Sequence, residues 1–133
     1  MVGAPELLTK ALRASSSAAL LLADGDINGA CNRAYYAMFD AARAALLAAG
    51  APVDPNIVRT HNGAIAAFGL HLVKTGQVQR EWGRTLNRAQ EIRQVADYTG
   101  ENVDMALASW VVGQSRLFIE EMRTTFRIDA SKS

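Results

Sequence analysis

The chain has 133 residues, half of them hydrophobic, and a formal net charge of +1. This length is typical of one domain that buries roughly two-thirds of its unfolded surface. The near-neutral charge argues against a protein whose overall field attracts nucleic acid or a membrane surface. Alanine and leucine are abundant and β-branched residues are sparse, which favours helices packed on helices. We therefore expect one all-α domain over residues 1–133, with a polar, frayed tail from about residue 128.

Membrane insertion and secretion are not expected. No window approaches ~20 uninterrupted apolar residues, and the first residues lack the basic and apolar segments of a signal peptide. The single cysteine, Cys31, cannot form an internal disulfide, which is typical of a cytoplasmic chain. Because Cys31 falls on an apolar stripe, it is interpreted as a small buried residue and not as a nucleophile.

The first helix is predicted to begin at Pro5, with Glu6 in the favourable first turn. Gly25, in the left-handed conformation, ends it, and Asp26 is the N-cap of the next helix. Such a short connection makes the two helices an antiparallel hairpin. The predicted buried stripe of the first helix is Leu8, Ala11, Leu12, Ser15, Ala18, Ala19 and Leu22.

Residues 26–49 are predicted to form the central helix, because aromatic and small apolar residues surround much of its circumference. Tyr35, Tyr36 and Phe39 supply the bulk, and they form an aromatic girdle that should be covered on more than one side. The apolar stripe consists of Cys31, Ala34, Met38, Ala41, Ala45 and Ala48. A second row, beside this stripe, consists of Arg33, Tyr36, Asp40 and Arg43.

Three further helices complete a predicted bundle of about five. Residues 50–59 are expected to be irregular because Pro52 and Pro55 exclude a helix interior. Thr60 is the predicted N-cap of the third helix, which ends at Gly76. The fourth helix runs from about Gln79 to Thr99 with Gly100 as its stop, and the fifth starts near Asn102. Their predicted inward residues are Ile65, Phe68, Gly69 and Leu72, then Trp82, Leu86, Ala89, Ile92 and Ala96, then Met105, Ala108, Val112, Ser115, Ile119, Met122 and Phe126.

Few residues are placed to carry chemistry. The two histidines, His61 and His71, have no ligand-spaced cysteine or carboxylate, so neither a metal site nor a cofactor is predicted. His61 is either a partly exposed residue beside the Thr60 cap or part of an anion site at free helix N–H groups. The row of Arg80, Arg84 and Arg88 is either a solvated face or a phosphate contact.

Arg93 borders the buried stripe of the fourth helix, so its guanidinium needs a carboxylate or a bound anion. Asp97, one turn later, is the obvious local partner. A structural ion pair is the first interpretation, and a ligand site is the second. Arg33 is the charge most expected to face the same cleft, with Asp40 and Asp97 available between the two arginines.

Three blocks resemble successive parts of the HEPN domain family. They are NRAYYAMFDAARAALL at residues 32–47, THNGAIAAFGLHLVKTG at 60–76 and NRAQEIRQVADY at 87–98. The resemblance covers about Pro5 to Met122, and it is strongest to the short stand-alone HEPN proteins often encoded beside a minimal nucleotidyltransferase. It implies an up-and-down helical bundle that commonly forms a homodimer and often acts in a toxin–antitoxin or defence system.

Active members of that family are metal-independent endoribonucleases with an arginine, four to six intervening residues, and a histidine. Here Arg93 occupies the arginine position, but Tyr98 stands where the histidine would be, and no histidine follows His71. An unperturbed tyrosine with a pKa near 10 is poorly matched to acid–base work at neutral pH. The resemblance therefore implies the helical-bundle fold and the nucleotidyltransferase partner for this chain, but it does not imply nuclease activity.

The leading hypothesis is a toxin or regulatory subunit that binds a cognate minimal nucleotidyltransferase. The ligand or partner site would use Arg33, Tyr36, His61, Arg93, Asp97 and Tyr98, and Tyr98 would be the residue modified by the partner. The alternatives are a ribonuclease with a non-standard site and a nucleotide-binding module without catalysis. Affinity for RNA or nucleotides should be weak. Replacement of Arg93 should impair binding more than thermal stability.

Overall fold

The computed structural model describes residues 2–98 and 103–130, and within them it contains helices and no strand. The prediction of an all-α bundle is confirmed. The elements are α1 (Ala4–Ala23), α2 (Ile27–Ala48), α3 (Pro55–Val58), α4 (His61–Phe68), the π-helix η1 (Gly69–Val73) that continues α4, α5 (Arg80–Tyr98) and α6 (Met105–Phe126). Across the part of the chain that is described, each helix is too short or too polar to cross a bilayer.

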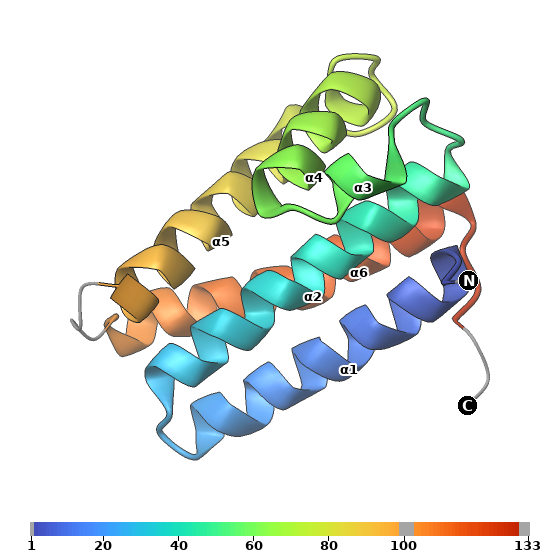
Figure 1. The fold of residues 1–133 in the computed structure, drawn as a ribbon. Coiled ribbons are helices and arrows are strands. Elements are labelled where there is room, and N and C mark those ends of the chain that lie inside the picture. The colour runs from blue at the N-terminus through green and yellow to red at the C-terminus, as the bar shows by residue number, and fades with distance from the viewer. Residues whose placement is uncertain (1, 99–102, 131–133) are drawn as a thin grey trace.

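Helix α2 is central, as predicted, because it contacts α1, α4, α5 and α6. In Figure 1 it lies in front of α6, with α1 along one side and α4 and α5 along the other. The buried stripe is dominated by alanine, which lets the neighbouring helices approach closely. Cys31 is fully buried, as expected, whereas Ala48 at the end of the stripe is exposed.

The aromatic girdle is buried inside the chain itself. Tyr35 is fully buried and Phe39 is 6 % exposed, while Tyr36 is half-buried. Helices α4 and α5 cover this girdle, and the apolar seam of α6 packs against α2. Both apolar surfaces are therefore largely covered within one chain.

The predicted caps are confirmed. The carboxylate of Asp26 accepts a hydrogen bond from the backbone N–H of Gly29 at 2.9 Å, and the hydroxyl of Thr60 accepts one from Gly63 at 2.9 Å. Gly25 has φ of +89°, the left-handed conformation that suits glycine after a helix. The Thr60 cap fixes the start of α4, and His61 is the first residue of that helix.

The segment predicted to be irregular contains the short helix α3. Pro55 is its first residue, where the missing N–H costs no hydrogen bond, and the Asp54 side chain caps it by accepting from the N–H of Asn56 at 2.8 Å. The next helix ends at Val73, before the predicted Gly76, after its last turn widens into η1. Gly76 instead has φ of +84° in the following turn.

The buried face of α1 is confirmed in part, because four of its predicted residues are buried: Leu8, Ala11, Ser15 and Ala18. The remainder of the face differs from the prediction. Leu7 and Ala14 are buried, whereas Leu12 is 40 % exposed and Ala19 is exposed. Leucine and alanine occur on both sides of this helix, so its sequence does not distinguish the face against α2 from the face beside α6.

Helix α5 begins at Arg80, one residue after the predicted start. Thr99, Gly100 and Asn102, which were predicted to end one helix and begin the next, lie outside the described residues. Most of the predicted α6 seam is buried, but Met105 is 51 % exposed. The tail was expected to fray, yet Ile128 is buried and its N–H donates to the carbonyl of Arg123 at 3.0 Å, because the left-handed Arg127 turns the chain back.

Candidate functional site

Arg93 is the buried charge around which the candidate site is built. Its guanidinium carbon lies 4.9 Å from the ring centre of Tyr35 and 5.9 Å from that of Tyr36. One nitrogen donates to Asp97, one helical turn later, at 3.2 Å. The predicted ion pair on α5 is therefore present, and two aromatic rings from α2 help to hold the cation.

His61, the first residue of α4, lies between two tyrosine hydroxyls. The distances are 2.8 Å from its Nδ1 to the hydroxyl of Tyr35 and 3.4 Å from its Nε2 to that of Tyr36. Its ring centre also lies 4.9 Å from that of Phe39. A neutral imidazole has one N–H donor and one acceptor, so it can satisfy both tyrosine contacts in one orientation.

Burial lowers the pKa of His61 from its usual value of 6.5, and the positive charge of Arg93 lowers it further. Burial also raises the pKa of Tyr35 well above its usual value, although Arg93 opposes this rise. At neutral pH both groups are therefore uncharged. The side chains joined by these contacts form the Arg93 cluster, which consists of Asn32, Tyr35, Tyr36, Phe39, His61, Arg93 and Asp97. Its cation is Arg93 and its anion is Asp97.

The hydrogen-bonding capacity of Arg93 is only partly used. Its Nε atom is buried and has no partner among the described residues. Asp97 is one-third exposed, and it also accepts a hydrogen bond from the side chain of Asn32 at 3.4 Å. The outer edge of the cluster is thus polar and open to solvent, while its inner part is aromatic.

These contacts join four of the six predicted site residues: Tyr36, His61, Arg93 and Asp97. Arg33 is half-buried on α2, and its charge acts on Asp40, where it lowers the pKa that burial raises. Tyr98, in the last turn of α5, has 77 % of its surface exposed. Arg33 and Tyr98 therefore lie outside the aromatic centre of the cluster.

Asn32, Tyr35 and Phe39 belong to the cluster but were not predicted as site residues. The sequence analysis predicts only a packing role for Tyr35 and Phe39, and it predicts no role for Asn32. The one available signal was the pair of adjacent tyrosines after an arginine, which placed aromatic groups on two faces of the same helix. Their contact with His61, more than twenty residues away, depends on how α4 returns over α2.

The arginine row on α5 lies outside this cluster. Arg80, Arg84 and Arg88 are all exposed, and Arg88 pairs with Glu91 at 3.2 Å. These features are those of a solvated helix face. Within residues 2–98 and 103–130, no group of three His, Cys, Asp or Glu side chains could hold a metal ion.

Comparison with known proteins gives a consistent assignment. The family model described as the HEPN domain matches residues 4–125. UPF0332 protein PH1297 of Pyrococcus horikoshii is 44 % identical over 75 residues, which cover 56 % of this chain and 49 % of that protein. A UPF0332 protein of Thermotoga maritima is 42 % identical over 87 residues, covering 65 % and 61 %. The chain thus aligns with about half to three-fifths of the length of these two relatives.

A third relative aligns over more of both chains. It is the Methanocaldococcus jannaschii protein named "Putative toxin MJ0605", which is 29 % identical over 112 residues, or 84 % of this chain and 80 % of that protein. The alignment includes most of the helical bundle, so the similarity concerns the whole domain and not one helix pair.

Proposed function

Because this chain belongs to the HEPN domain family, we propose that it is a toxin or regulatory subunit that works with a cognate minimal nucleotidyltransferase. The family match over residues 4–125 confirms the resemblance drawn from the three sequence blocks. The relative named as a toxin supports a toxin-like role. A cytoplasmic location and a homodimer are part of the same proposal.

The proposed partnership rests on one observation, which is that the three tyrosines of the chain differ in their exposure to solvent. The hydroxyls of Tyr35 and Tyr36 contact His61. Tyr98 is 77 % exposed and lies five residues after Arg93, where the family's nuclease motif would have its histidine. Its hydroxyl is therefore the accessible phenol at this end of the bundle.

The proposed reaction is nucleotide transfer to Tyr98. The phenol oxygen attacks the α-phosphorus of a nucleoside triphosphate bound to the nucleotidyltransferase. A bond from oxygen to phosphorus forms, the bond between the α-phosphorus and the bridging oxygen breaks, and pyrophosphate leaves with that electron pair. A base of the partner accepts the phenol proton. Exposure of Tyr98 supports this role, because an acceptor must enter another protein's active site.

Binding of a nucleotide or RNA at the Arg93 cluster is a second candidate function. The buried Nε of Arg93 without a partner in the described chain favours it, since a phosphate oxygen could accept from that atom. Asp97 opposes nucleotide or RNA binding, because its carboxylate already neutralises much of the charge of the Arg93 guanidinium. We therefore expect weak binding.

The test is to incubate the purified protein with a minimal nucleotidyltransferase, which the proposal expects to be encoded beside it, and a nucleoside triphosphate. Intact-mass and peptide mass spectrometry should show one added nucleotide on Tyr98. The variant Tyr98→Phe should remain unmodified, whereas Arg84→Ala, at an exposed position of the same helix outside the Arg93 cluster, should be modified like the wild type. Modification that persists in Tyr98→Phe would show that the acceptor is a different residue and would refute the proposal.

A further inference from the structure

A cavity of about 480 Å³ lies where α1 begins and α2 ends. It is lined by the start of α1, the last turns of α2, the connection after α2, and α3. Gly50, with φ of +66°, turns the chain after α2, and the side chain of Asp54 caps the start of α3. In Figure 1 these segments lie at the opposite end of the bundle from the last turn of α5. The volume is within the usual range for small-molecule sites.

The wall of this cavity is aliphatic. Eight of its ten lining residues are apolar, and they include Leu7, Leu46 and Val58, which are buried. The other two are Arg43 and Arg59, and among the described residues no acidic and no aromatic side chain lines the cavity. A ligand must therefore be apolar over most of its length, with its polar group at the arginines.

Arg43 lines the cavity with part of its hydrogen-bonding capacity free. Its guanidinium carbon lies 5.5 Å from the ring centre of Phe39, and its Nη1 lies 3.4 Å from a carboxylate oxygen of Asp40. The buried Nε has no partner among the described residues, and Nη2 makes no hydrogen bond within them. These two atoms form one edge of the guanidinium, to which a carboxylate can bind with two parallel hydrogen bonds. Use of Nε requires the side chain to rotate toward the cavity.

The two arginines leave positive charge unbalanced at the cavity. Asp40 pairs with Arg43 but lies outside the lining. Arg59, the residue after α3, is exposed, and its side chain has no acidic partner within the part of the chain that the structure describes. After the pair of Arg43 with Asp40, one positive charge therefore remains to attract an anion.

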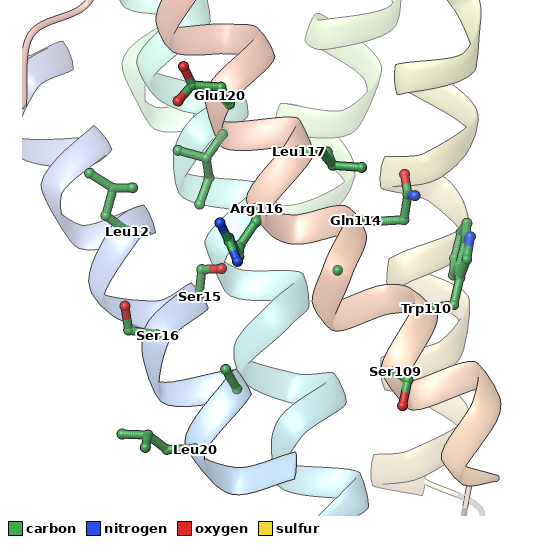
Figure 2. Close-up of a pocket in the computed structure, with 13 residues that line it drawn as sticks. Leu12, Ser15, Ser16, Leu20, Ser109, Trp110, Gln114, Arg116, Leu117 and Glu120 are labelled. Atoms are coloured by element: carbon green, nitrogen blue, oxygen red, sulfur yellow. The ribbon is translucent and has the colours of Figure 1, made fainter. Parts of the chain in front are cut away.

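The hollow between α1 and α6 differs from this cavity in width and in charge. It has a volume of about 1200 Å³, and Figure 2 shows Leu12, Ser16 and Leu20 along α1 and Arg116 and Glu120 along α6. Because Arg116 and Glu120 carry opposite charges, that lining does not favour a ligand of either sign. The cavity beside α3 makes the more specific demand on a ligand.

We propose that the cavity beside α3 binds an aliphatic monocarboxylate with the chemistry of a medium-chain fatty acid. Its carboxylate accepts hydrogen bonds from Arg43 and Arg59, and its alkyl chain lies against the aliphatic wall. A single negative charge matches the one that is missing at the cavity. A flexible alkyl chain suits this wall better than a planar ring, since no lining side chain among the described residues offers a ring to stack on.

Binding here goes beyond the proposed function, because no residue of the Arg93 cluster lines the cavity. Tyr98 lies in the last turn of α5, at the other end of the bundle in Figure 1. Carboxylate binding and nucleotide transfer to Tyr98 are therefore separate properties, and each can fail without the other.

Isothermal titration calorimetry of the full chain with decanoate at neutral pH tests the site. Decanoate should bind with a dissociation constant below about 1 mM. Octanoate has two fewer methylene groups to bury, so it should bind about tenfold more weakly. Decyltrimethylammonium, with a similar chain and the opposite charge, should bind at least about tenfold more weakly than decanoate, because the two arginines repel it.

A matched pair of charge reversals tests the role of the arginines. Arg59→Glu should weaken decanoate binding by about tenfold or more, whereas Arg84→Glu, the same change at an exposed position of α5, should bind like the wild type. No detectable binding of decanoate at about 1 mM would overturn the proposal. So would equal affinities for decanoate and decyltrimethylammonium, or equal decanoate binding by Arg59→Glu and the wild type, because either result would indicate adsorption that does not use the arginines.

Discussion

Replacement of Arg93 by alanine should destabilise the fold substantially. The substitution removes the side chain of Arg93, a residue that is 6 % exposed and whose guanidinium contacts Tyr35, Tyr36 and Asp97. It leaves Asp97 without its cation and leaves a space beside two rings. The burial of Arg93 therefore adds a stability cost to the loss of binding expected from the sequence.

The magnitude follows from these contacts. A desolvated cation over an aromatic ring contributes about 1–2 kcal/mol, and here Tyr35, at 4.9 Å, is the closer ring. The hydrogen bond to Asp97 contributes about 1 kcal/mol, because Asp97 is one-third exposed and water can replace part of it. Together we expect a loss of about 2–3 kcal/mol in the free energy of unfolding. For a domain of this length, that is a fall in Tm of about 10 °C.

Urea and thermal denaturation followed by circular dichroism would measure this loss. Arg84→Ala, at an exposed position of the same helix, is the control and should change the free energy by less than about 0.5 kcal/mol. Arg93→Lys keeps the charge but lacks the planar face, so it should lie between the two. A loss below about 1 kcal/mol for Arg93→Ala would refute the view that the aromatic cage and Asp97 hold this helix in place.

Two further predictions concern pH and RNA. The pKa of His61 is lower in the folded than in the unfolded chain, so the unfolded state binds more protons as the pH falls below about 6.5, and stability should decrease there. His61→Gln should reduce that decrease between pH 7 and pH 5 in urea titrations, and an unchanged pH profile would contradict the assignment. With a net charge of +1, the protein should bind RNA only weakly at ~150 mM salt, and tight, sequence-independent binding in a filter or anisotropy assay would disprove this.

Local patterns in the sequence predicted the structural features that depend on residues close together in the chain. The caps at Asp26 and Thr60 and the pair of Arg93 with Asp97 each involve residues within one helical turn, where spacing fixes geometry. The central position of α2 followed from apolar residues around its circumference. These features were predictable because each depends on the period of one helix.

Contacts between distant segments could not be predicted in this way. His61 meets Tyr35 because α4 packs back over α2, and no pattern in either helix encodes that distance. Part of the buried face of α1 was wrongly predicted for a related reason, since Leu12 would fit a core as well as Leu7 does. Which leucine is covered depends on the neighbouring helix, and within the described residues Leu12 is left 40 % exposed while Leu7 is buried.

The alanine-rich face of α2 sets an unusual pattern of tolerance to mutation. Seven of its alanines, at positions 30, 34, 37, 41, 42, 44 and 45, have no exposed surface. A substitution to glycine removes only one methyl group at these positions. A larger side chain must push a neighbouring helix away, and it should lower the free energy of unfolding by about 1–3 kcal/mol for each overpacked site. Saturation mutagenesis should therefore find this helix more sensitive to conservative apolar enlargement, such as Ala→Val or Ala→Leu, than to Ala→Gly or Ala→Ser. In evolution, the spacing between the helices would then be the property under selection, more than the amount of apolar surface.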